Sequence, residues 1–358
     1  MNTPKSPAAN PLNTKNILSV DLGKLYTKAC ISRNPDNVVV IPSHVQYIGF
    51  SQIFSGAMYK YQAISNNPLI NIWLEYKGSG YAVGQLAAKF GANLGFGQSK
   101  VDDALVKVLA AAGHFKLKDE ISVVISLPFF YPAQFEKEKL ELTSLLFGPH
   151  VMNFRGESVY LNITKVWVIP DGLCSLLWTK TKSNKGFSIP DFTKIPVGIV
   201  DIGYQNINFI TVDNFQWVKD TSEIEDFGMN KFYEIIAAEI DGADSQSLGL
   251  ICAVNKPKGE RFYRPKSASK PTNLDDFLPN ITEMFSRDIC YLVFDWLPEG
   301  VTDIIITGGG GEFFWEEIQP RFKEARINAY LAAPSRQANV LGQYIYIEAL
   351  LSAVRAVR

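Results

Sequence analysis

Two short apolar segments, at residues 17–23 and 197–203, share one hydrophobic pattern. In each, a run rich in β-branched residues predicts a buried strand, an Asp closes the run, and a Gly two residues later allows a tight reversal. A second apolar strand follows both turns. Each unit is therefore expected to be a β-hairpin whose tip carries one carboxylate, Asp21 in the first and Asp201 in the second.

Strands and helices alternate through the rest of the chain, which predicts a mostly parallel sheet with helices on its faces. We expect Gly113 to end one helix and residues 170–172 to open another. The glycine run 308–311 is expected to be a loop before a helix that begins near Glu312. The expected strands are residues 38–41, 121–127, 159–169 and 303–307, and the expected helices are residues 102–112, 133–147, 229–240, 281–297 and a last one from 338 onward.

The composition indicates a globular chain and excludes several classes of protein. With 358 residues, 47% of them hydrophobic, the chain is long enough for two halves about one cleft. Its apolar runs fall far short of the roughly 20 residues that span a bilayer. Residues 1–15 hold no apolar stretch that would serve as a signal peptide. We therefore expect a disordered tail there, no transmembrane segment, and a cytoplasmic protein.

The charge and the spacing of Cys and His argue against two further kinds of binding site. The formal net charge of −1 argues against broad contact with nucleic acid, so a link to DNA would need another protein or a local patch. The four Cys and three His are spread without paired spacing, which argues against a metal site built from them. The basic stretch 255–272 is expected to be a solvated loop, with a partner contact as the alternative.

The two hairpin tips are the candidate chemistry. A single Asp-x-Gly after a strand is usually an ordinary turn. Two such tips that face each other would clamp a phosphate chain, because Gly lets backbone N–H groups approach phosphate oxygens. The Asp21 and Asp201 carboxylates would then hold Mg²⁺ through its water shell.

These elements, in this order, resemble the actin-type ATPase superfamily, which also includes sugar kinases and heat-shock chaperone ATPases. Asp21-Leu22-Gly23, with Lys28 seven residues after the Asp, resembles the first phosphate hairpin of that superfamily, and Asp201-Ile202-Gly203 resembles the second. Residues 307–310 are similar to its adenosine loop. Residues 170–172 and 338–342 resemble its two connecting helices.

Within the superfamily, the chain resembles the bacterial and archaeal actin-like proteins of the ParM type. Residues 81–84, residues 126–128 and the pair Ala338-Asn339 with Gly342 carry this likeness. The resemblance implies an α/β fold duplicated as in actin and ribonuclease H, with two lobes around a nucleotide cleft. Lobe I would comprise residues 16–40, 98–195 and 338–358, with residues 41–97 as an inserted small subdomain, and lobe II would comprise residues 196–337.

The resemblance also implies an activity. Such a protein binds ATP (or GTP) with Mg²⁺ between its lobes, polymerises with itself into filaments, and hydrolyses the nucleotide. It serves plasmid segregation through a DNA-bound adaptor protein, or it serves as a cytoskeleton. Two alternatives stay open: a small-molecule (sugar-type) kinase of the same superfamily, and a nucleotide-binding scaffold with little hydrolysis.

The roles of single residues follow from the matching positions. Asp21 and Asp201 would be catalytic and hold Mg²⁺, and Lys28 would reach the phosphates. Asp171 stands where the family has a Glu or Gln that orients the attacking water; it is one methylene shorter, and it could instead only cap a helix. Further nucleotide contacts are expected at Gly23, Lys24, Leu25, Gly203, Tyr204, Gln205, Gly228, Gly308, Gly309 and Gly310.

Two residues depart from the pattern of the family. Lys24 stands where relatives often carry a small or hydroxyl residue, and Asn208 replaces an acid that some relatives have. Both leave the rate and the nucleotide preference open. The aromatic residues 313–315, beyond the glycine run, are expected to pack in the core instead of lining a nucleotide site.

Overall fold

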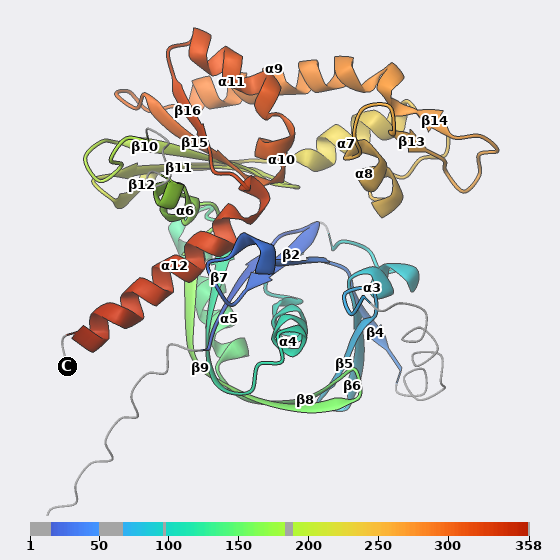
Figure 1. Ribbon diagram of the computed structural model, residues 1–358, viewed down its shortest axis with the longest axis vertical. Coiled ribbons are helices and arrows are strands. Elements are labelled where there is room, and N and C mark those ends of the chain that lie inside the picture. Colours follow the sequence, from blue (N-terminus) through green and yellow to red (C-terminus); the bar gives the residue numbers. More distant parts are fainter. Residues whose placement is uncertain (1–15, 50–66, 96–97, 183–188, 357–358) are drawn as a thin grey trace, which may run out of the picture.

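The computed structural model describes residues 16–49, 67–95, 98–182 and 189–356, so the expected tail at residues 1–15 lies outside it. Two β-sheets form two lobes (Figure 1). Lobe I contains the nine-stranded sheet and lobe II the five-stranded sheet. The duplicated two-lobed α/β fold expected from the sequence is confirmed.

The nine-stranded sheet of lobe I has the order β3-β2-β1-β7-β9-β8-β5-β6-β4. Its strands β1, β7 and β9 are parallel neighbours, and β2 pairs antiparallel with β1. The strands are β1 (Ile17–Leu22), β2 (Tyr26–Cys30), β3 (Val39–Pro42), β4 (Val45–Ile48), β5 (Ile72–Tyr76), β6 (Ser79–Val83), β7 (Asp119–Leu127), β8 (Gly148–Phe154) and β9 (Glu157–Pro170).

The five-stranded sheet of lobe II, in the order β12-β11-β10-β15-β16, repeats the first five strands of lobe I. An antiparallel hairpin is again followed by two parallel neighbours. The register repeats as well, because Asp21 faces Lys28 across the first hairpin and Asp201 faces Asn208 across the second. The strands are β10 (Val197–Ile202), β11 (Ile207–Asp213), β12 (Gln216–Glu225), β15 (Asp303–Thr307) and β16 (Asn328–Leu331), with a separate small pair β13 (Phe262–Tyr263) and β14 (Thr272–Asn273).

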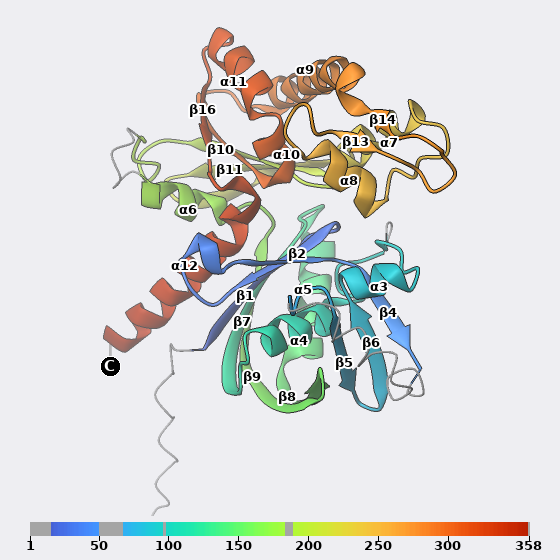
Figure 2. The ribbon, with the colours of Figure 1, turned by 45° about the vertical axis from the view of Figure 1, so that its right-hand side comes forward.

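Helix α4 (Ala104–His114) lies inside lobe I, and the long sheet curls around it (Figure 2). Its buried positions include the small residues 110–113. Small side chains let the strands approach the helix closely. Gly113 was expected to end this helix, but it lies within the helix. A Cβ on Gly113 would stand 2.5 Å from the ring of Phe154, so packing against β8 explains this glycine.

Two helices lie between the two sheets, α6 (Ser175–Lys182) and α12 (Ser335–Ala356) (Figure 1). They share one apolar core with β1 of lobe I and with β10 and β15 of lobe II. The two helices cross where Gly342 meets the backbone carbonyl of Cys174, and any side chain at Gly342 would overlap that carbonyl. This crossing fixes the lobes against each other.

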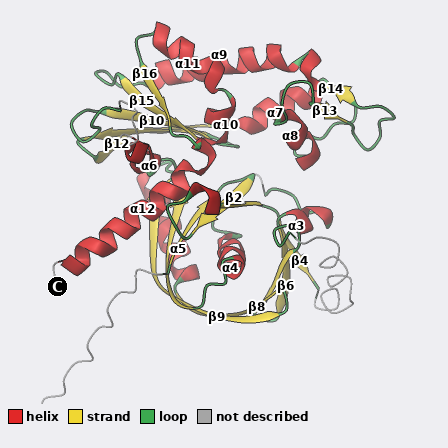
Figure 3. Cartoon of the chain, viewed as in Figure 1, coloured by secondary structure: helices red, strands yellow, loops and turns green. Residues whose placement is uncertain are grey.

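The remaining helices are α3 (Gln85–Lys89), α5 (Pro132–Leu146), α7 (Met229–Ala238), α8 (Leu248–Val254), α9 (Leu278–Trp296), α10 (Gly308–Phe313) and α11 (Trp315–Glu324). In lobe II, α9 and α11 lie on the side of the sheet away from lobe I, whereas α10 lies toward α12 (Figure 3). Phe314 packs against Phe232 and Phe285 in the core of this lobe, and Phe313 and Trp315 lie beside it, so the expected packing of these aromatic residues is confirmed. No helix in the described part of the chain is both long enough and apolar enough to cross a membrane.

Two local expectations were wrong. Residues 170–172 do not open a helix directly, because β9 continues to Pro170, a turn follows, and α6 begins at Ser175. The glycine run 308–311 is not a loop, because α10 begins at Gly308 itself. Packing explains why these helical positions are glycines. Gly310 packs against Ile202 of β10 and Gly311 against Ile306 of β15, and neither contact leaves room for a Cβ.

Candidate functional site

A cavity of about 500 Å³ lies between the lobes, and both hairpin tips line it. Asp21 reaches it from the end of β1, and Asp201 from the end of β10. Asp171 follows β9, two strands away from β1, and its N–H donates to the carbonyl of Leu127 at 2.8 Å. The carboxyl ends of parallel strands meet at one edge of a sheet, so all three Asp residues converge on the cavity.

Close backbone contact brings Asp171 to the second tip. Gly172, at φ +82°, lies so close to Asp201 that a Cβ on it would stand 2.8 Å from the Asp201 Cβ. Only Gly adopts this conformation without strain, and here it also supplies the space. The turn after β9 in lobe I thereby contacts the tip of lobe II.

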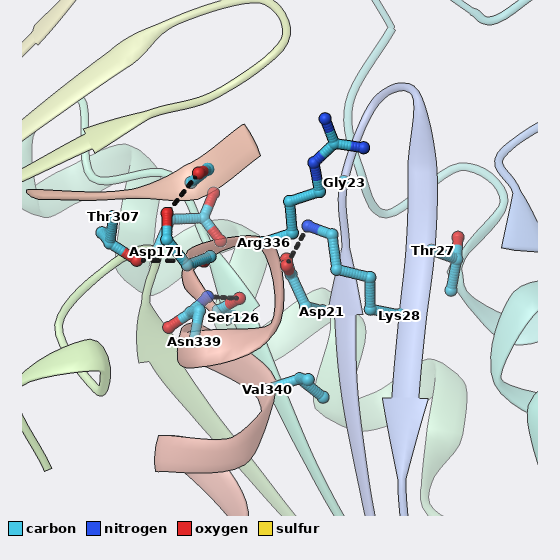
Figure 4. A network of polar contacts seen from close by, with 12 residues as sticks. Asp21, Gly23, Thr27, Lys28, Ser126, Asp171, Thr307, Arg336, Asn339 and Val340 are labelled. Carbon is cyan, nitrogen blue, oxygen red and sulfur yellow. Dashed lines mark hydrogen bonds and ion pairs between the residues drawn. The ribbon is translucent and has the colours of Figure 1, made fainter. Parts of the chain in front are cut away.

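Two lysines pair with these carboxylates inside the cavity. The Lys28 ammonium lies 2.8 Å from Asp21, directly across the hairpin, and Figure 4 shows it directed at that carboxylate. The Lys100 ammonium lies 2.5 Å from Asp171. The sequence analysis missed Lys100, because it stands in a short segment before α4 that carries no recognisable motif.

The three carboxylates have different electrostatic environments. Burial and repulsion from Asp171 and Asp21 raise the pKa of Asp201 to about 7. Burial also opposes the charge on Asp21, but attraction by Lys28 and Lys100 outweighs it and lowers the Asp21 pKa. The difference follows from the register, since Asp21 faces a lysine where Asp201 faces a neutral Asn208.

Glycines leave the backbone of both tips open to the cavity. A Cβ on Gly203 would stand 2.9 Å from the carbonyl of Asn206, and one on Gly23 would overlap the carbonyl of Tyr26. Gly308, at φ +85°, stands beside Asp201, because Thr307 of β15 pairs with Asp201 of β10. Side chains at these positions would fill the cradle that the tips form.

The structure brings together twelve of the expected site residues. These line the cavity: Asp21, Gly23, Lys24, Leu25, Lys28, Asp171, Asp201, Gly203, Tyr204, Gln205, Gly308 and Gly309. Two others do not line it. Gly228 packs behind the second tip, where a Cβ would stand 2.5 Å from the Tyr204 carbonyl oxygen, and Gly310 packs against Ile202. Both glycines support the cavity wall from behind.

Lys24 and Asn208, the two departures from the family pattern, have distinct environments. The Lys24 ammonium donates to the carbonyls of Gly95 and Gln98, and it therefore ties the first tip to the segment before α4. Burial and repulsion from Lys100 lower the pKa of Lys24 to about 8. Asn208 also lines the cavity, and its buried side-chain oxygen has no hydrogen-bond partner within the protein.

The lobe II wall of the cavity holds further residues that sequence reasoning missed. Tyr204 stacks on Tyr233, with 6.0 Å between ring centroids, and the Tyr233 hydroxyl accepts from Asn255 at 3.0 Å. Arg336 donates to Asn255 at 2.5 Å. This wall offers aromatic faces and hydrogen-bonding groups beside Gly308 and Gly309. Tyr204 was expected from the sequence, whereas Tyr233, Asn255 and Arg336 were not, because no spacing rule marks them.

Two of the quoted sequence segments meet at the base of the cavity. The amide of Asn339, at the start of α12, donates to the hydroxyl of Ser126 at the end of β7, at 3.1 Å (Figure 4). Asn339 also lines the cavity. The bond links the connecting helix to the strand beside β1.

The arrangement fits a Mg²⁺-bound polyphosphate. Around the tips, three carboxylates stand beside two paired lysines, so one carboxylate there lacks a direct cationic partner that a hydrated divalent cation would supply. The glycine cradle gives phosphate oxygens access to backbone N–H groups. In the described part of the chain no three His, Cys, Asp or Glu side chains could hold a metal ion directly. The donor set therefore fits a hydrated ion better than one held by direct protein ligands.

Comparison with known proteins agrees with this geometry. Residues 19–173 match the family model of the N-terminal domain of actin-like proteins. The crystal structure of the actin-like protein Alp7A is 16% identical and covers 95% of this chain and 97% of its own, with a TM-score of 0.72. The archaeal actin homologue Ta0583, in complex with ADP, is 17% identical and covers 93% of this chain and 99% of its own, with a TM-score of 0.71.

A 15-stranded ParM filament from Clostridium botulinum is also similar, with 19% identity, coverage of 93% of this chain and 98% of its own, and a TM-score of 0.64. No curated protein sequence matches the chain. The matched domain and the two-lobed fold are both similar to those of actin-like proteins. Residues 19–173 therefore resemble the N-terminal domain of actin-like proteins, and the two-lobed fold is similar to that of solved actin-like structures, including a ParM protein.

Proposed function

We propose that the chain is an ATPase that binds ATP (or GTP) with Mg²⁺ between its lobes, polymerises with itself into filaments, and hydrolyses the nucleotide. One observation carries the proposal: Asp21 and Asp201, at the tips of two hairpins from opposite lobes, line one cavity together with Asp171. An isolated turn would not need a second carboxylate opposite it. The match to actin-like proteins supports the same function.

The residues have separate roles in this proposal. Asp21 and Asp201 hold Mg²⁺ through water, and backbone N–H groups of the tip residues that follow Gly23 and Gly203 bind phosphate oxygens. The Gly203 N–H itself donates to the Asn206 carbonyl at 2.9 Å and closes the second tip. Bound Mg²⁺ would supply neutralisation of the charge that develops on the phosphates. Lys28 adds positive charge beside Asp21.

Asp171 is the residue we propose to orient the attacking water. One of its oxygens, Oδ1, is buried without a hydrogen-bond partner in the protein, so it can accept a hydrogen bond from water. The other oxygen is paired with Lys100. The turn that follows β9 brings Asp171 close to Asp201, which compensates for its missing methylene.

Self-assembly belongs to the proposal because a similar structure is itself a filament. We further propose a cytoplasmic protein that serves either plasmid segregation, through a DNA-bound adaptor, or a cytoskeletal role. The Lys100–Asp171 ion pair also favours a second candidate, a nucleotide-binding scaffold with slow hydrolysis. Lys100 holds one oxygen of the carboxylate that would otherwise orient water.

Sedimentation with ATP and Mg²⁺, together with phosphate release, tests the function. Wild type should pellet and release phosphate, and Asp201→Ala should do neither. Asp213→Ala, which removes an exposed carboxylate from the far end of the same lobe II hairpin, is the matched control and should behave as wild type. Assembly without phosphate release would favour the scaffold. A persistent monomer that phosphorylates an added sugar would refute the proposal in favour of a kinase.

A further inference from the structure

Lys100 is the feature of the cavity that the proposed function leaves unexplained. Its side chain is only 10% exposed, and its ammonium lies 2.5 Å from Asp171. Burial alone would lower the Lys100 pKa, but attraction by Asp171, Asp21 and Asp201 outweighs burial and raises it. Lys100 therefore stays charged within range of all three carboxylates.

Lys28, which also lines the cavity, has a direct partner of its own. Lys28 faces Asp21 in the register of the hairpin, and the two side chains form their own ion pair. Asp171 and Asp201 have no comparable partner on their own strands. Lys100, which reaches in from the segment before α4, pairs directly with Asp171, and Lys28 and Lys100 together attract Asp201.

We infer that Lys100 is a positioning residue that acts as an internal counter-ion. Its ammonium holds Asp171 in place and supplies positive charge near the three carboxylates. A divalent cation without nucleotide is therefore excluded from the site. This inference rests on the proposed function for the identity of the ligand. A bare Mg²⁺ that enters beside Lys100 adds positive charge to a site already supplied with it. When a polyphosphate shares the cavity, its negative charge supports both cations.

The consequence is an ordered use of the site. Without nucleotide, Lys100 remains paired and no divalent cation is bound at the carboxylates. With nucleotide present, Lys100 gains a second anionic partner, and Asp171 is free to exchange its ion pair for a hydrogen bond to water. A merely structural ion pair, which only attached the segment before α4 to β9, would have no effect on cation affinity.

Cation binding to the nucleotide-free full chain tests the inference. Mn²⁺ binding is followed by the electron paramagnetic resonance signal of the free ion, and Mg²⁺ binding by calorimetry. Lys100→Met removes the charge while keeping an apolar stem of similar length. We expect its affinity for either cation to exceed that of wild type at least tenfold, and Asp171→Asn in the same background to abolish the gain.

Lys107→Met is the matched control. Lys107 is a buried lysine on α4 that pairs with Asp103 at 3.8 Å and does not line the cavity. Lys107→Met should bind Mn²⁺ and Mg²⁺ with the affinity of wild type. If Lys100→Met, shown to be folded by circular dichroism, bound Mn²⁺ no better than wild type, the inference would be overturned.

The wild-type measurement decides the matter even if the Met variant does not fold. Saturable binding of one Mn²⁺ to nucleotide-free wild type at micromolar concentration would overturn the inference, and its absence supports exclusion. Lys100→Gln, which keeps polarity, is the second variant and should show the same gain. None of these measurements uses a nucleotide, so the inference and the proposed function can fail independently.

Discussion

Replacement of Asp201 by Asn should stabilise the nucleotide-free protein at alkaline pH while removing its capacity for Mg²⁺-nucleotide. In the folded protein, burial together with the charges of Asp171 and Asp21 raises the Asp201 pKa to about 7, from an ordinary value of 3.8. Asp201 is thus ionised at physiological pH against an electrostatic cost. Asn has nearly the same shape and carries no charge.

The sign and size follow from proton linkage. Between pH 4 and pH 7 the folded chain holds a proton on Asp201 that the unfolded chain has released, so wild-type stability falls as the pH rises through this window. A difference of about three pKa units at about 1.4 kcal/mol each sets an upper limit of about 4 kcal/mol. Asp201→Asn has no carboxylate to ionise, so its stability does not fall with pH for this reason. It should be about 2–4 kcal/mol more stable than wild type at pH 8 and equal to it near pH 4.

Urea denaturation followed by tryptophan fluorescence, with chelator present and nucleotide absent, measures the effect at several pH values. Asp213→Asn, at an exposed position of lobe II, should show no such pH-dependent gain. Calorimetry with Mg²⁺-ATP should show that Asp201→Asn binds far more weakly than wild type. The reasoning is refuted if Asp201→Asn and wild type have the same free energy of unfolding at pH 8.

Two further predictions concern Asp171 and the glycine run. Asp171→Ala should leave assembly intact and slow phosphate release at least tenfold, because the variant loses the buried Oδ1, which has no hydrogen-bond partner in the protein and can accept from water; an unchanged rate would show that Asp171 has no catalytic part. Gly308→Ala should lose about 2–4 kcal/mol, because Gly308 has φ +85° and its methyl would stand 2.5 Å from Asp201 Oδ1. Gly309→Ala, with no atom nearer than 3.8 Å, should be nearly neutral, and equal melting temperatures for the two variants would contradict this account.

The hydrophobic pattern was sufficient to predict the hairpins and their tips. β-Branched runs closed by Asp-x-Gly are local signals, and both strands of each hairpin follow directly in sequence. The duplication then located the cavity, because two similar hairpins in a two-lobed α/β chain face each other. Asp21, Asp201 and most of the tip glycines could therefore be assigned before the structure.

The errors and omissions arise from contacts between distant segments. Gly113 looks like a helix end from its neighbours, and only the ring of Phe154 explains it. The glycine run begins a helix, and its glycines at 310 and 311 are explained by Ile202 and Ile306, which leave no room for side chains. Lys100 was missed because an ion pair across 71 residues has no local signature.

The repeated register explains why the site needs a lysine besides Lys28. Both hairpins place the partner of the Asp at the same cross-strand position, but the first carries Lys28 there and the second carries Asn208. Lobe I therefore neutralises its own carboxylate, and lobe II does not. Asp171 adds a third carboxylate, and Lys100 pairs with it, so Asp201 is the carboxylate without a direct cationic partner. Asp201 therefore has most to gain when a hydrated cation and a polyphosphate bind together, because only then does it acquire a positive neighbour without a free cation being held beside Lys100.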